Sequence, residues 1–251
     1  MSKSTSIKLN FIMSALLTMS SFIFPLITFP YVSRILLPEG TGKVSFATSV
    51  VSYFALFAQL GIPTYGIRAC AQVRDDKIKL TRTVHELLII NLIMSAIAYL
   101  AFFVALYNVP RLSQDKTLFL IASSSILFNA IGMEWLYKAL EQYTYITIRS
   151  VAFKFIALIA MFLLVHQKSD YIVYGGISTV AAFASNIFNF IHARHYVSAR
   201  PVGHYNLKRH MKAIFVFFAM SCAVTIYTNL DTVMLGFMAT DADVGCYSAA
   251  V

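Results

Sequence analysis

Charge is scarce in this chain. Only 12% of its 251 residues are charged, whereas 59% are hydrophobic, and the mean hydropathy is +0.71. Soluble domains carry about twice that share of charged residues. Loops with room for a separate soluble domain are also lacking, because only short polar segments separate the apolar ones. This composition excludes a soluble fold with a single membrane anchor.

Cysteines and catalytic motifs are equally sparse. The three cysteines indicate no disulfide framework and are interpreted as small apolar side chains. The chain has no Gly-x-x-x-x-Gly-Lys-Ser/Thr, no His-Glu-x-x-His and no Gly-x-Ser-x-Gly. The sequence therefore predicts neither an enzyme of these classes nor a bound cofactor or metal. We interpret four histidines as a solvated, titratable surface beside anionic lipid: His192, His195, His204 and His210.

Seven long apolar stretches make up most of the chain. Each has about 19 to 25 residues, the length that a helix needs to cross roughly 30 Å of hydrocarbon. Backbone polar groups in lipid must be satisfied within the segment, so stretches of this kind are helical. The sequence thus predicts an all-α, polytopic membrane helix bundle. The stretches are 9–32, 44–65, 87–107, 118–136, 146–165, 171–191 and 214–238.

Basic residues are concentrated on every second loop. The net charge of +9 suggests a nucleic-acid partner at first sight, but there is no arginine-rich arm, and the basic residues lie near the ends of the apolar stretches. Three quarters of the 20 Lys and Arg residues belong to the N-terminal tail and the even-numbered loops. The positive-inside rule places these in the cytoplasm, with the N-terminus. The remaining basic residues are Arg34, Lys43, Arg111, Lys116 and Lys168.

The C-terminal residues predict the start of a second unit. A new apolar run begins at Val244 and stops at Val251, too short to cross a bilayer, so we expect a chain truncated within an eighth helix. Gly-x-x-Ser-x-Ala occurs at 42–47 and again at 245–250, six helices apart, as in transporters with parallel repeats. Chance matching of small residues explains the same pattern equally well.

Four motifs in register resemble one family over essentially the whole chain. They are Phe29-Pro-Tyr-Val-Ser-Arg-Ile-Leu-Leu-Pro-Glu-Gly-Thr-Gly-Lys-Val-Ser-Phe46, Gly61-Ile-Pro-Thr-Tyr-Gly-Ile-Arg68, Glu134-Trp-Leu-Tyr-Lys-Ala-Leu-Glu141 and Asn229-Leu-Asp-Thr-Val-Met-Leu-Gly236. The chain resembles the polysaccharide-repeat flippases of the multidrug/oligosaccharidyl-lipid/polysaccharide exporter superfamily. The resemblance implies two helix bundles around a central cavity. Residues 1–212 would form the N-terminal six-helix bundle, and 213–251 the start of the second.

The resemblance also implies a function. Such a protein moves an undecaprenyl-diphosphate-linked oligosaccharide across the bacterial cytoplasmic (inner) membrane for capsule, O-antigen or exopolysaccharide synthesis. Its partners would be this lipid-linked oligosaccharide, membrane lipids, a polysaccharide polymerase and a chain-length regulator, with no nucleic acid. Coupling would be to a H⁺ or Na⁺ gradient. Two alternatives stay open: a cation-coupled drug or metabolite exporter of the same superfamily, and a membrane polysaccharide polymerase.

Embedded polar residues are the candidate site, since charge within a membrane usually faces a cavity or a partner. Arg149 and Lys154 are candidates for contact with the diphosphate and Arg34 for contact with the substrate, with anchoring at a helix end as the alternative for each. Five amide side chains within the apolar stretches are candidates for hydrogen bonds between helices or for a sugar path: Gln59, Asn91, Asn129 and the pair Asn186 and Asn189, which lie one turn apart.

Three further charged residues are candidates for coupling and gating. Glu134 and Lys138 are spaced i,i+4, which favours an ion pair on one helix face. That pair either stabilises the helix end or exchanges partners as the cavity opens and closes. Asp231 lies within the seventh apolar stretch, where an acid indicates a functional role or a salt bridge between bundles.

Overall fold

The computed structural model describes residues 7–251, and every regular element within them is a helix. By length and composition, six of these helical stretches could cross a membrane. The expected all-α, polytopic membrane bundle is therefore confirmed. The six stretches are Ile7–Ala71, Lys77–Asn108, Lys116–Ala139, Tyr143–Leu164, Lys168–His195 and Lys208–Met238.

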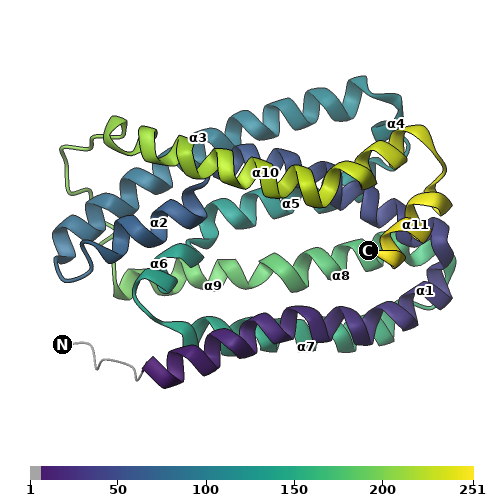
Figure 1. Cartoon of the computed structure of the whole chain (residues 1–251), viewed down its shortest axis with the longest axis horizontal. Helices are drawn as coiled ribbons and strands as arrows, with labels where there is room; N and C mark the ends of the chain where they lie inside the picture. The colour runs from purple at the N-terminus through teal and green to yellow at the C-terminus, as the bar shows by residue number, and fades with distance from the viewer. Residues whose placement is uncertain (1–6) are drawn as a thin grey trace.

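The first stretch contains two of the seven predicted segments. Helix α1 (Ile7–Gln59) is interrupted at Leu37, whose backbone has φ 57° and ψ 175°. A proline disfavours helical geometry in the residue before it, and Leu37 is followed directly by Pro38. The chain reverses at this point, so that α1 forms two arms, 7–36 and 38–59 (Figure 1). Two consecutive residues with positive φ, Leu60 and Gly61, separate the second arm from α2 (Ile62–Ala71).

The remaining helices follow in a simple up-and-down order with short connections. Asp76 caps α3 by accepting hydrogen bonds from the amides of Ile78 and Lys79, and Thr240 and Asp243 form a capping box on α11. The bounds are α3 Lys77–Asn108, α4 Pro110–Ser113, α5 Lys116–Gly132, α6 Glu134–Ala139, α7 Tyr143–Leu164, η1 Lys168–Asp170, α8 Tyr171–Thr179, η2 Val180–Ala184, α9 Ser185–His192, η3 Ala193–His195, α10 Lys208–Met238 and α11 Asp241–Ala250.

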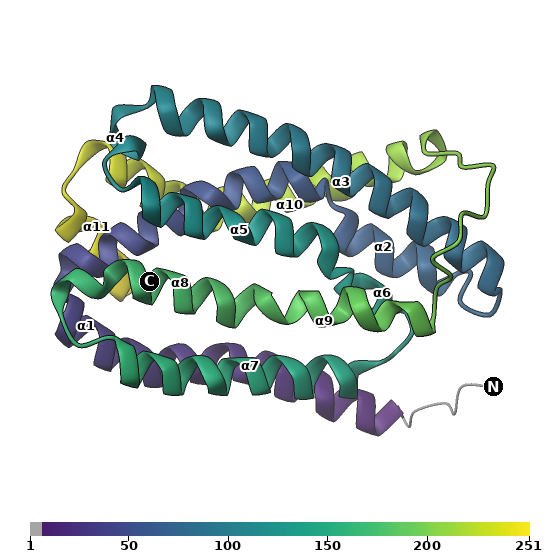
Figure 2. The ribbon, with the colours of Figure 1, turned by 180° about the vertical axis from the view of Figure 1, so that it is seen from behind.

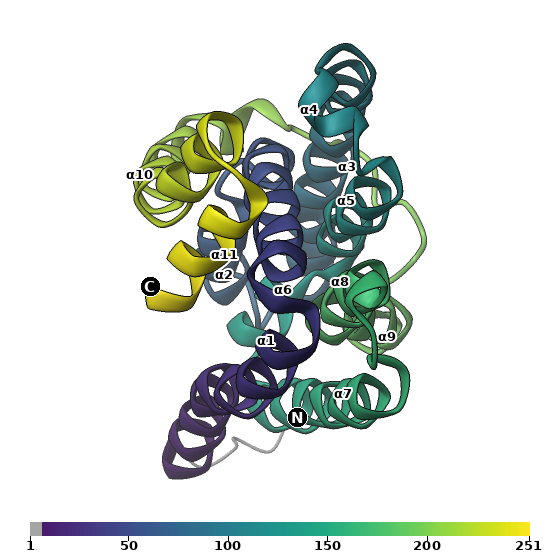
Figure 3. The same ribbon diagram turned by 90° about the vertical axis from the view of Figure 1, so that its right-hand side faces the viewer.

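The long helices lie side by side with their ends gathered at two poles (Figures 1 and 2). One pole holds the start of α1, the α2–α3 turn, α6 and the segment 196–207. The other holds the reversal of α1, α4 and α11. Viewed along the bundle, α7 and the first arm of α1 lie on one side, and α3 and α10 on the opposite side (Figure 3). The even-numbered loops, which carry most of the basic residues, thus share one pole.

The two copies of Gly-x-x-Ser pack against each other. A Cβ on Gly42 would overlap the carbonyl of Asp241, and a Cβ on Gly245 would overlap that of Pro38. Ser45 donates a hydrogen bond to Ser248 (Oγ–Oγ 3.2 Å). Only glycine permits backbones to approach this closely. The repeated motif is therefore a contact between the second arm of α1 and α11, whatever its origin.

Gly42→Ala should destabilise this contact, because the added methyl group meets backbone atoms that cannot turn aside. We expect a loss of about 1–3 kcal/mol in stability, seen as a lower melting temperature of the purified protein. Gly176→Ala is the matched control, since its Cβ would lie 3.7 Å from the nearest atom, a methyl of Ile121. Equal melting temperatures for the two variants would contradict the close approach.

The orientation in the membrane can be tested at both poles. A reporter fused after Val73 or Val202 should read as cytoplasmic, and one fused after Val109 as external, because the basic residues cluster at the first pole. The reverse pattern would overturn the predicted orientation.

The division of the chain at residue 212 into two bundles stays a prediction.

Candidate functional site

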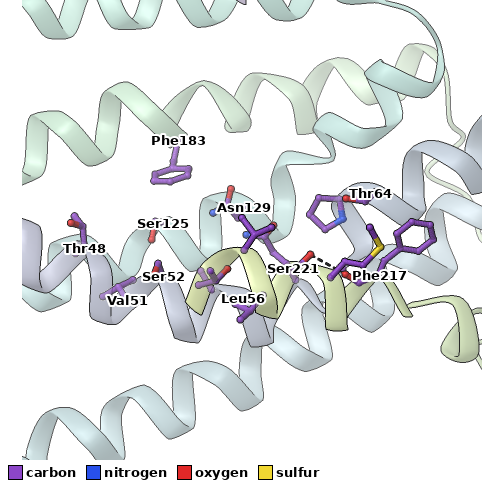
Figure 4. Close-up of a pocket in the computed structure, with 18 of the residues that line it drawn as sticks. Thr48, Val51, Ser52, Leu56, Thr64, Ser125, Asn129, Phe183, Phe217 and Ser221 are labelled. Carbon is purple, nitrogen blue, oxygen red and sulfur yellow. Dashed lines mark hydrogen bonds between the residues drawn. The ribbon is translucent and has the colours of Figure 1, made fainter. Parts of the chain in front are cut away.

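A cavity of about 680 Å³ lies between the second arm of α1, α2, α5, the α8–η2 helix and α10. This is a typical size for a ligand pocket. Hydroxyl and amide side chains line it together with apolar ones, and no charged residue of the described chain is among them. Figure 4 shows Phe183 pointing from η2 towards Ser125 and Asn129. The polar members are Thr48, Ser52, Gln59, Thr64, Ser125, Asn129, Thr179, Ser221 and Thr225.

The backbone departs from regular α-helix at two places in the wall of this cavity. Gly61, at the break between α1 and α2, forms part of the wall, and so does Phe183, within the π-helical turn η2. Within membranes, irregular backbone is tolerated where it is buried in protein or lines a cavity, and π-turns occur often at functional sites. A Cβ on Gly61 would overlap the backbone of Phe217 and Phe218. The break thus allows α10 to close one side of the cavity.

Lys154 lies in a second, separate pocket of about 430 Å³ between the first arm of α1, α7, α8 and η2. It sits halfway along α7, and its Nζ donates hydrogen bonds to the hydroxyls of Ser20 and Ser21, each at 2.9 Å. Among the described residues it has no carboxylate within salt-bridge distance. Lys154 therefore points inward to neutral partners rather than to the cytoplasmic headgroups.

Arg149 is buried closer to the pole at which α1 begins, with only 8% of its surface exposed. Within the described residues its Nε and Nη1 have no hydrogen-bond partner, and the guanidinium lies 5.7 Å from the centre of the Tyr145 ring. A buried cation without hydrogen bonds is costly. Glu134 is the acid whose charge acts on both Arg149 and Lys154. Two poorly neutralised cations thus follow one another along α7.

The predicted ion pair of Glu134 and Lys138 is present, with Nζ and Oε1 2.8 Å apart, at the pole where α1 begins. Both side chains are partly exposed, which suits an ion pair that can open and close. Glu141, the next acid on this segment, instead binds Arg74 in the α2–α3 turn at 2.6 Å.

The other candidates lie apart from these pockets. Arg34 is exposed near the reversal of α1, and Asp231 is exposed and accepts a hydrogen bond from the hydroxyl of Tyr247 (2.6 Å). Asn186 and Asn189 are buried on α9; Asn186 packs against Gly132, and the amide group of Asn189 has no partner among the described residues. Neither asparagine lines the large cavity. The structure thus brings Arg149, Lys154 and the Glu134–Lys138 pair into one region and leaves Arg34, Asp231 and the two asparagines outside it.

Of the uncharged cavity residues, Gln59 and Asn129 were predicted from the sequence as candidates for a sugar path, whereas the serines and threonines were missed. A signal for them exists in the sequence, since Thr48 and Ser52, Ser125 and Asn129, and Ser221 and Thr225 are each spaced i,i+4, which puts each pair on one helix face.

One histidine interpretation was wrong. His210 is not on a solvated surface but 3% exposed, since it packs against the fully buried Glu86 on α3. No role was predicted for Glu86 from the sequence, because its partners Arg209 and His210 lie more than 120 residues away in the chain.

Comparison with known proteins now adds the family. Residues 7–251 match the family described as "Polysaccharide biosynthesis protein". The chain belongs to this family. It is 24% identical over 247 residues to an Escherichia coli K12 protein named "Putative O-antigen transporter", covering 98% of this chain and 60% of that protein. A Shigella dysenteriae protein of the same name is 25% identical, with 97% and 61% covered.

The chain thus spans about three fifths of the length of these curated relatives. No solved structure matches.

Thiol labelling can test whether the large cavity holds water. In a background without the three native cysteines, Ser221→Cys should react with a small, charged maleimide or methanethiosulfonate reagent, because Ser221 lines the cavity. Ser95→Cys is the matched control, since Ser95 is 4% exposed and lies outside the cavity. Equal and slow reaction at both positions would show a dry, closed space.

Proposed function

We propose that this protein translocates a lipid-linked oligosaccharide, carried on an undecaprenyl diphosphate, across the bacterial cytoplasmic membrane. The observation that carries the proposal is that two neighbouring pockets differ in charge. One is lined by neutral hydroxyl and amide groups, and the other holds the embedded cation Lys154, with Arg149 nearer the cytoplasmic pole. Membership of the polysaccharide biosynthesis family supports the same reading.

The cationic region suits a diphosphate. A multiply charged anion cannot enter a low-dielectric region unless fixed positive charge and hydrogen bonds replace its water. Among the described residues, no group bonds two of the guanidinium nitrogens of Arg149, and Lys154 bonds only two neutral hydroxyls. Both groups are thus free to gain an anionic partner. Glu134, bound to Lys138, supplies a nearby acid that can balance their charge when the anion leaves.

The neutral cavity suits sugars. Hydroxyls and amides both donate and accept hydrogen bonds, so they can replace water around a carbohydrate without favouring either sign of charge. Phe183 and Phe217 add apolar rings to the same wall. An exporter of organic cations is less well supported, because no acidic residue lines this cavity among the described residues. A polymerase has no observation in its favour here.

The finer features of the proposal follow the predicted orientation. The N-terminus lies in the cytoplasm, the substrate enters at the pole that carries most of the basic residues, and an ion gradient drives the cycle. A polymerase and a chain-length regulator would receive the product on the outer side.

The test is substrate translocation by the full-length protein in cells that lack their own flippase. Lys154→Gln and Arg149→Gln should each lower translocation about 10- to 100-fold, the effect of losing one hydrogen bond to a charged group. Lys154→Arg should keep most of it, because charge is conserved. Lys168→Gln, an exposed lysine at the outer pole, is the control. Membrane levels of all variants are measured alongside.

Wild-type translocation by the Lys154→Gln, Arg149→Gln double variant would refute the diphosphate site. Translocation of a neutral or cationic drug by the wild type, with no effect on the lipid-linked sugar, would favour the alternative exporter.

A further inference from the structure

A buried polar cluster fastens α10 to α3 at the cytoplasmic pole, away from both pockets. Its centre is the carboxylate of Glu86 on α3, which has no exposed surface. Oε2 accepts from Arg209 Nε at 2.9 Å and Nη2 at 2.5 Å, and lies 2.7 Å from Nε2 of His210. Oε1 accepts from the backbone amide of Asn206 at 2.7 Å. Four contacts from one short stretch of chain thus converge on a single acid.

The partners of Glu86 come from the end of a connecting strap, residues 196–207, and from the first turn of α10. The strap runs from η3 to α10 across the end of α3 (Figure 2). It is held a second time where the hydroxyl of Tyr205 lies 2.9 Å from Nδ1 of His85. The cluster therefore decides whether the start of α10 stays against α3.

His210 is the member of this latch that can change charge near neutral pH. Its Nδ1 lies 2.7 Å from the hydroxyl of Tyr65 on α2, while Nε2 faces Glu86. The neutral ring satisfies both contacts when Nε2 carries the proton and Nδ1 accepts from Tyr65. The carboxylate and the guanidinium then balance, so the cluster has no net charge; Glu86 is fully buried, whereas the side chain of Arg209 is 44% exposed.

A proton on Nδ1 upsets this balance. The second cation must share one carboxylate with Arg209, whose Nε lies 3.2 Å from Nε2 of the ring. The ring is 3% exposed, so water cannot screen the new charge. The ring contacts Tyr65 of α2, Glu86 of α3 and Arg209 of α10. Beyond these, Arg68 and Cys70 act on Tyr65, and His85 of α3 bonds Tyr205 of the strap. Among these described groups, Glu86 is the only carboxylate.

We propose that His210 is a proton-binding site whose neutral form latches α10 to α3, and whose protonation releases the latch at the cytoplasmic pole. The sign follows from the closed geometry: the arrangement is complete with a neutral ring, so the latch holds at higher pH and opens as the pH falls. Proton binding is in this way linked to the position of a spanning helix. The proposal does not depend on which molecule the protein transports.

The test uses the backbone amide of Asn206 as a native probe in the full-length protein, reconstituted in lipid nanodiscs. Hydrogen–deuterium exchange of the segment around Asn206 is measured from about pH 8 to about pH 5, the range in which histidine titrates, and corrected for intrinsic exchange. The wild type should lose protection as the pH falls, by up to about tenfold per pH unit for one titrating group. His210→Gln, which retains a neutral donor and acceptor, should stay protected throughout.

Two controls separate this latch from other effects of acid. The amides of Ile78 and Lys79, at the same pole, bind the Asp76 carboxylate. The amide and the ammonium of Lys79 lower the pKa of Asp76, so this cap persists through the whole range. Loss of protection there as well would mean general unfolding and would overturn the proposal. His85→Gln should leave the pH dependence in place, because His85 bonds only the strap.

A wild type that stays protected at every pH would also overturn the proposal. So would a pH dependence that survives in His210→Gln or disappears in His85→Gln. Glu86→Gln gives an independent check: removal of the negative charge should leave Asn206 poorly protected at all pH values. Full protection in that variant would show that Glu86 does not hold the strap.

Discussion

The hydrogen-bonding demand of the backbone in lipid is the constraint on which this structure depends. Each polar backbone group within hydrocarbon must bond inside its own helix, so the chain has few places at which to leave helical geometry. Between the two poles it does so at Leu60 and Gly61, at Met133 and in the π-turn η2. Gly61 and η2 border the large cavity. Two of these three breaks thus lie beside the large polar cavity.

Helix content, approximate bounds and the grouping of loops could be predicted from the sequence, because apolar length and basic residues act locally. The predicted ion pair of Glu134 and Lys138 is present for the same reason, since i,i+4 neighbours on one helix meet whatever the fold, while their role in gating stays a prediction. Burial of His210 could not be predicted, because its partners Glu86 and Tyr65 come from other helices. A residue in a basic loop looks solvated until the partner helix is known.

The uncharged cavity and the region of Lys154 and Arg149 differ in whether they need a counter-charge. The cavity between α1, α5 and α10 needs no counter-charge, since hydroxyls and amides bond to one another, to water or to a ligand at similar cost. Lys154 and Arg149 cannot be neutral in this way, and the protein gives them only hydroxyls, an aromatic ring and the field of Glu134. Because these two cations are incompletely neutralised, they destabilise the folded protein, and a bound anion would relieve this destabilisation.

The fastening of α10 at both poles connects these features. At the pole that holds α4 and α11, Arg111 binds Asp241 and donates to the carbonyl of Gly236 at 2.8 Å, while the Gly42–Gly245 contact brings α11 against α1. At the opposite pole the same helix is held by Glu86. Between them α10 forms one wall of the cavity. Glycine packing responds little to pH, whereas the Glu86 cluster contains a histidine. If protonation of His210 releases the latch, as proposed above, α10 loses its contact with α3 at this end while the contacts of Arg111 and of the glycines remain at the other, so this wall would tilt about that end rather than detach.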